Sequence, residues 1–63
     1  KNKSNIYVIL RHDFSGSDVV VATCLSSEKA DDLVGEYTQL FLDKGFTTDE
    51  VYFYATISVF YDV

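Results

Sequence analysis

The residues from Val51 to Val63 are rich in β-branched and aromatic side chains and contain neither proline nor glycine. With the period of two that a strand imposes, one face of this run is almost wholly apolar and the other is aromatic and hydroxylated. The first face comprises Val51, Phe53, Ala55, Ile57, Val59, Tyr61 and Val63, and the second comprises Tyr52, Tyr54, Thr56, Ser58, Phe60 and Asp62. A chain of 63 residues supplies one layer of cover for a sheet. We therefore expect the core on the first face and a contact surface on the second.

Two further strands are predicted near the N-terminus. Asn5 to His12 alternates with period two, residues 13–18 have the composition of a turn, and Val19 to Leu25 is rich in β-branched residues. A hairpin symmetric about Ser15 and Gly16 pairs Ile6 with Leu25, Tyr7 with Cys24, Val8 with Thr23, Leu10 with Val21, and His12 with Val19. This register places the more apolar sets of the two strands on one face.

A helix is predicted between the hairpin and the C-terminal strand. Ser26 and Ser27 offer an N-cap hydroxyl, and Glu28 adds a carboxylate in the first turn. An apolar stripe follows at steps of three and four: Ala30, Leu33, Val34, Tyr37, Leu40 and Phe41. Lys44 and Gly45 predict its end, with Phe46 making a hydrophobic contact beyond the cap. Gly35, inside the helix, suggests close packing against the sheet.

The predicted fold is α+β, with a ββαβ order, a three-stranded antiparallel sheet in the order 2-1-3, and one helix on one face. Residues 1–5 are expected to be a disordered polar tail and residues 6–63 a single domain. The side expected beneath the helix comprises Ile6, Val8, Leu10, Val19, Val21, Leu25, Phe53, Ile57 and Val59. The uncovered side is expected to show Tyr7, Ile9, Val20, Ala22, Cys24, Tyr52, Tyr54 and Phe60.

The last strand is long for this body. Thirteen extended residues span roughly 43 Å at about 3.3 Å each, whereas a compact chain of this length has a diameter of about 27 Å. The strand must bend, bulge or project, and a projecting edge favours pairing with a second chain.

Composition narrows the classes of partner. Ten acidic residues against five lysines and arginines give a net charge of −5, which argues against nucleic acid and anionic lipid and favours a protein with a basic surface. The alternative is that acidity only keeps the domain in solution. One cysteine, Cys24, fits a reducing compartment, and no apolar run approaches the about 20 residues of a membrane span. We expect a cytoplasmic protein that binds no membrane.

No residue set indicates catalysis, a cofactor or a metal. His12, Asp13 and Cys24 have the chemistry of a nucleophile and its base, but the hairpin register separates Cys24 from His12 by five strand positions and places them on opposite faces. Asp13 and Asp18 are interpreted as turn residues, because the other ligands of a calcium loop are missing. We therefore expect no enzyme, no cofactor and no metal site.

Two groups of side chains are candidates for partner binding. Tyr52 and Tyr54 could stack on nucleobases, but the cations that accompany such platforms are missing, so protein contact is favoured. The helix carries acidic residues on its outer face, which are either solvated or docked on a basic patch. The candidate partner-binding residues are Tyr7, Ile9, Tyr52, Tyr54, Phe60, Glu28, Asp32 and Glu36.

In its strand-strand-helix-strand order, acidity and Ser-Ser-Glu-Lys-Ala helix start at Ser26 to Ala30, the chain resembles small accessory proteins of phages and mobile elements. Some members of that class inhibit host defence systems, including anti-CRISPR proteins. The resemblance implies a non-enzymatic inhibitor of a host protein. Two other hypotheses stay open: a structural or regulatory homodimer whose aromatic sheet face is the subunit interface, and an enzyme or ligand-binding domain built across a dimer, with Cys24 and tyrosines lining a cleft.

Overall fold

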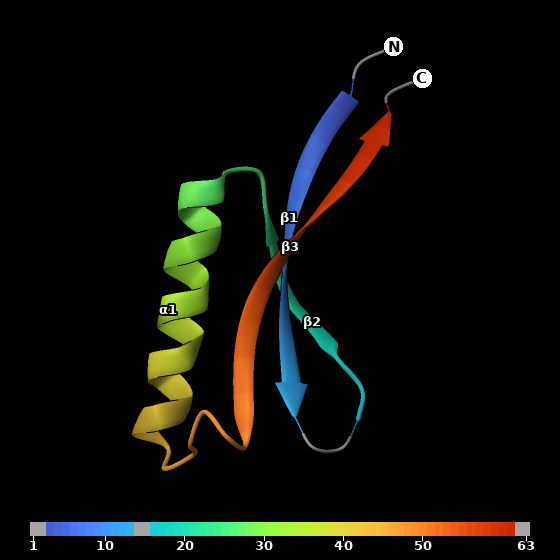
Figure 1. The fold of residues 1–63 in the computed structure, drawn as a ribbon. Coiled ribbons are helices and arrows are strands. Elements are labelled where there is room, and N and C mark those ends of the chain that lie inside the picture. The colour runs from blue at the N-terminus through green and yellow to red at the C-terminus, as the bar shows by residue number, and fades with distance from the viewer. Residues whose placement is uncertain (1–2, 14–15, 62–63) are drawn as a thin grey trace.

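The computed structural model describes residues 3–13 and 16–61, with side chains for 4–13 and 16–59. The elements are β1 (Lys3–Asp13), β2 (Val19–Cys24), α1 (Ser27–Asp43) and β3 (Val51–Tyr61). The strands form one antiparallel sheet in the order β2-β1-β3, and α1 lies along one face of it (Figure 1). The predicted α+β class, ββαβ order and strand order are confirmed.

β1 begins earlier than the sequence pattern indicates. The first strand was expected from Asn5, but Lys3, Ser4 and Asn5 already pair with residues 59–61 of β3. Three residues assigned to the polar tail are therefore part of the sheet. Residues 1–2, at the start of that expected tail, lie outside the described residues.

Both predicted helix ends are confirmed. The Ser26 hydroxyl accepts a hydrogen bond from the Lys29 backbone N–H at 3.1 Å, as an N-cap does. At the other end Gly45 has a φ of 98°, and the Phe46 N–H donates to the Phe41 carbonyl at 3.1 Å. The Phe41 and Phe46 rings lie 5.3 Å apart, which completes the expected hydrophobic contact of the cap.

The expected packing role of Gly35 is wrong. A Cβ added at Gly35 would meet nothing within 4 Å, and the residue is exposed. No close approach to the sheet therefore requires glycine at this position.

The hairpin register is confirmed at one end and shifted at the other. Tyr7 pairs with Cys24 and Val8 with Thr23, as predicted, but a bulge between Ile9 and Leu10 changes the rest. Beyond it Leu10 faces Val20 instead of Val21, and Val19 faces Arg11 instead of His12. A bulge sets one extra residue of β2 against β1.

The helix covers the face of β1 that was expected to be uncovered. The ring of Phe53 stacks on Tyr37 at 5.3 Å between centroids and meets the edge of Phe41 at 5.1 Å. Phe53 is paired with Arg11, and paired residues share a face. The odd-numbered side chains of β1 therefore point to α1, and Ile9 among them is fully buried.

The face of β1 that meets the helix could not be predicted from β1 itself, because both of its faces are apolar. Alternation shows which residues share a face, but only the register against β3 shows which face meets the helix. Tyr7, Ile9, Ala22 and Cys24, expected on the uncovered side, lie on the side of α1, whereas Ile6, Val8 and Leu10, expected beneath the helix, lie on the other. For β3, the prediction that Phe53 packs against the helix is confirmed.

The core is small and the sheet is longer than the helix that covers it. Among the described side chains, the buried ones are Ile9, Ala30 and Phe53. The molecule measures 46 × 24 × 12 Å, and the start of β1 and the end of β3 extend as a two-stranded arm beyond α1 (Figure 1). Of the three outcomes expected for the last strand, bending, bulging or projecting, the structure shows projection, with the projecting part paired with β1 (Figure 1). Its side chains Ile57 and Val59, expected under the helix, are 62 % and 45 % exposed.

Candidate functional site

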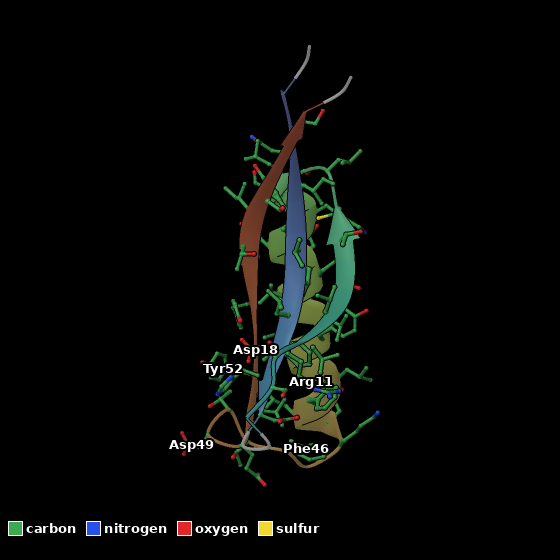
Figure 2. The ribbon with its side chains drawn as sticks, turned by 90° about the vertical axis from the view of Figure 1, so that its right-hand side faces the viewer. Arg11, Asp18, Phe46, Asp49 and Tyr52 are labelled. Carbon is green, nitrogen blue, oxygen red and sulfur yellow. The ribbon has the colours of Figure 1, made fainter. Side chains whose placement is uncertain are left out.

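The side of the sheet away from α1, here called the open sheet face, has no helix over it (Figure 1). Figure 2 looks onto it, with the sheet in front of the helix. Its described side chains are Ile6, Val8, Leu10, His12, Val20, Thr23, Tyr52, Tyr54, Thr56 and Ser58. Val20 is 56 % exposed and Tyr52 46 %. The face is open because the chain has one long helix, and a sheet has two faces.

Four side chains at the hairpin end of the open sheet face form a polar and aromatic group, here called the Asp18 cluster: His12, Asp18, Tyr52 and Tyr54. His12 and Tyr52 are opposite each other on β1 and β3, with ring centroids 4.9 Å apart. Asp18 precedes β2, and its Oδ1 lies 2.6 Å from Nδ1 of His12. The Tyr54 hydroxyl donates to Oδ2 of Asp18, and the two tyrosine rings lie 6.0 Å apart.

The hydrogen bonds of the Asp18 cluster favour a charged carboxylate. The bond from the Tyr54 hydroxyl, and then the bond to His12, hold the pKa of Asp18 below its ordinary value. The same bond raises the pKa of Tyr54, because it is made by the neutral hydroxyl. The cluster thus offers an ionised carboxylate beside two aromatic rings. Such a group can hold a lysine or arginine side chain by an ion pair and by cation–π contact.

Sequence reasoning missed the role of Asp18. Asp13 and Asp18 were both interpreted as turn residues, and neither was expected to bind His12. Asp13 lies near Arg11, with 3.6 Å between Nε and Oδ2. Neighbours in a strand point to opposite faces, so Asp13 projects from the side of α1 and His12 from the open sheet face. The sequence feature that could have indicated this role is the position of Asp18 across the turn from His12. The bulge brings Asp18 opposite the end of β1.

The structure does not bring Cys24 and His12 together. Cys24 pairs with Tyr7 near the far end of β2, whereas His12 is at the hairpin end of β1. The thiol of Cys24 donates to the Ser26 carbonyl at 3.4 Å, close to the helix N-terminus. Within the described part of the chain, no group of three or more histidine, cysteine, aspartate or glutamate side chains is placed to hold a metal ion.

The candidate acidic residues of the helix lie on a separate surface. Glu28, Asp32 and Glu36 are exposed and follow one another at steps of four, while Tyr37 and Phe41 point to the sheet. With 3.6 residues per turn, Glu28 and Asp32 point away from the sheet, whereas Glu36 lies on the flank of the helix, next to Tyr37. The acidic helix face and the open sheet face are therefore on opposite sides of the molecule.

The remaining candidate residues are also divided. Tyr52 and Tyr54 lie together on the open sheet face, whereas Tyr7 and Ile9 face the helix, and Ile9 is fully buried. The backbone of Phe60 pairs with Ser4, but its side chain lies outside the described residues.

One hollow of about 370 Å³ follows the flank of α1. It is lined by Leu33, Glu36, Tyr37 and Leu40, and the Tyr37 hydroxyl donates to the Val21 carbonyl at 3.4 Å. A ligand site needs several convergent polar groups in a concave, mostly apolar setting. The single carboxylate of Glu36 does not provide them.

Comparison of the chain with protein-family models, with curated proteins and with solved structures gives no match. In the described residues, no helix has the length and apolar character needed to cross a membrane.

Proposed function

We propose that this chain is a non-enzymatic protein-interaction module that docks a basic protein surface onto its open sheet face. One observation carries the proposal: an uncovered apolar and aromatic sheet face ends in the Asp18 cluster, where an ionised carboxylate accepts a hydrogen bond from Tyr54, whose ring lies 6.0 Å from that of Tyr52. Tyrosine gives a large contact area at low entropic cost and is enriched in protein interfaces. A lysine or arginine of the partner would contact Asp18 and the rings of Tyr52 and Tyr54.

The charges of the open sheet face favour protein over nucleic acid. Among the residues whose side chains are described, Arg11 faces α1, and Lys29 and Lys44 belong to the helix segment. None of these cations is on the open sheet face, where phosphate contacts would need them. Stacking of bases on Tyr52 and Tyr54 would have to proceed without that attraction.

An inhibitor of a host protein is one form that this function would take, and the cytoplasm is its proposed location. The net charge of −5 supports a basic partner, and the single cysteine supports a reducing compartment. On this proposal the acidic helix face stays solvated while the opposite side of the molecule is engaged.

The test compares variants as bait in a lysate of the cells in which the chain is native. A retained basic protein is purified, and its affinity is measured by calorimetry. Val20→Lys places a cation on the open sheet face and should weaken binding at least tenfold, about 1.4 kcal/mol. Leu40→Lys is the matched control, because Leu40 is similarly exposed, at 47 %, but lies on α1. Equal binding by the two variants contradicts the proposal.

The same two variants also distinguish partner docking from the alternative that the open sheet face is a homodimer interface. If Val20→Lys lowers the mass of the free protein, the open sheet face is a subunit interface, and partner docking on it is refuted. If the variant keeps the wild-type mass and loses the basic partner, the docking proposal is supported.

A further inference from the structure

The outer edge of β3 is long and unprotected. β3 pairs with β1 alone, through eleven consecutive residue pairs without a register shift. From Val51 to Tyr61 it contains no charged residue, no proline and no glycine. Its outward N–H and C=O groups therefore form a regular row along the whole strand.

Edge strands of monomeric proteins usually carry features that prevent pairing with another chain. Charged side chains, proline, bulges and short length are the common ones. The opposite edge of this sheet has two of them, because β2 has six residues and faces a bulge. β3 has none of them within Val51–Tyr61, so its edge is suited to a further strand.

Apolar side chains of β3 also lack cover. Ile57 and Val59 are on the α1 side of the sheet, opposite Tyr7 and Asn5, but they are 62 % and 45 % exposed because the arm extends beyond the helix. A core of so few buried side chains is marginal for a domain of this size. Burial of Ile57 and Val59 would stabilise the protein by about 25 cal/mol for each Å² of apolar surface removed from water.

We propose that β3 pairs antiparallel with β3 of a second copy of this chain, giving one continuous sheet in the order β2-β1-β3-β3-β1-β2. The register with full overlap of the eleven residues sets Thr56 opposite the same residue of the second copy. It also sets Phe53 opposite Val59 and Ala55 opposite Ile57. The exposed apolar residues of each arm then lie beside the covered part of the other copy, where Phe53 packs against α1.

A second copy fits this edge better than a foreign strand, because the pattern of β3 is self-complementary. In the full-overlap register odd-numbered residues meet odd-numbered residues, so apolar side chains face apolar ones and hydroxylated side chains face hydroxylated or aromatic ones. The strand contributes no charge to the contact. The acidic residues on the outer side of α1 point away from the sheet, and repulsion between those of the two copies is screened by salt.

The first test is the mass of the full chain in solution, measured by sedimentation at tens of micromolar, where a dimer of moderate affinity is populated. The wild type should be a dimer. Ile57→Lys brings two cations close to the two-fold axis and should weaken dimerisation at least tenfold. Leu40→Lys, at a similarly exposed aliphatic residue of α1, should keep the wild-type mass. A monomeric wild type, or an unchanged dimer in Ile57→Lys, overturns the proposal.

The second test locates the contact without relying on a destabilised variant. In a Cys24→Ala background, Thr56→Cys places one thiol opposite its counterpart, within the Cβ separation that a disulfide spans. Mild oxidation should give a covalent dimer. Val20→Cys, on the other edge of the sheet, is the matched control and should stay monomeric on a denaturing gel. Equal cross-linking at both positions refutes a specific β3 edge contact.

The proposal is independent of the docking function. Val20→Lys changes the open sheet face and leaves the β3 edge intact, whereas Ile57→Lys changes the edge on the side of α1. Loss of partner binding and loss of dimerisation are therefore separable results.

Discussion

Ile9→Val tests which face of β1 meets the helix. Ile9 is fully buried, and removal of one buried methyl group costs about 1 kcal/mol, within the 0.5–1.5 kcal/mol range of such substitutions. The smaller change is chosen because a domain of this length has a total stability of roughly 3 to 9 kcal/mol, and an alanine at this position would approach that limit. The melting temperature should fall by about 4–8 °C.

Ile6→Val is the matched control for this prediction, because it makes the same change on the open sheet face of the same strand, where Ile6 is only half-buried. Its cost should be a few tenths of a kcal/mol. Urea unfolding followed by far-UV circular dichroism measures both variants, at one protein concentration because a dimer makes the midpoint concentration-dependent. A larger loss in Ile6→Val than in Ile9→Val would show that the opposite face of β1 is covered.

Three further predictions concern the pKa of Asp18 and the roles of two glycines. Tyr54→Phe should raise the pKa of Asp18 toward its ordinary value in a carboxyl NMR titration, because the Tyr54 hydroxyl is the main cause of its lowering, whereas Tyr52→Phe should leave that pKa unchanged. Since the pKa of Asp18 is lowered by folding, the stability from this bond is present above the pKa of an unfolded aspartate and is lost as pH falls through the lowered value. Gly35→Ala should raise stability by about 0.5–1 kcal/mol in thermal unfolding, because an added Cβ meets nothing. Gly45→Ala should lower it by about 1 kcal/mol, because Gly45 has a positive φ.

The sequence predicted the helix because its two ends depend on local signals. Ser26 caps the helix and Gly45 ends it through bonds to residues within one or two turns. The order of strands follows from short connections and the need to cover one face of a sheet. The helix ends are thus encoded within a few residues of where they appear, whereas the strand order follows from general rules of connection.

The face of β1 and the partner of His12 could not be predicted because both depend on register. β1 is apolar on both faces, so its own pattern does not determine which face meets α1. Pairing of Arg11 with Phe53 determines it. The bulge after Ile9 shifts β2 by one residue, and the short distance between Asp18 and His12 is found only on that shifted strand. Pairing between distant segments carries this information, and no local pattern contains it.

Edge pairing and open-face docking together would make an assembly with two different sides. Because odd-numbered residues of β3 meet odd-numbered residues, both helices lie on one side of the continuous sheet, and both open sheet faces lie on the other. The acidic residues Glu28, Asp32 and Glu36 of both copies then project from the helix side, while two Asp18 clusters face the opposite side. A partner with two basic sites at a matching spacing would bind both clusters, and the second contact would form at high effective concentration.

In that case Ile57→Lys, which separates the copies without touching the open sheet face, should weaken the capture of a two-site partner and leave each single-site affinity unchanged in calorimetry. An equal loss in both measurements would mean that the edge itself contacts the partner.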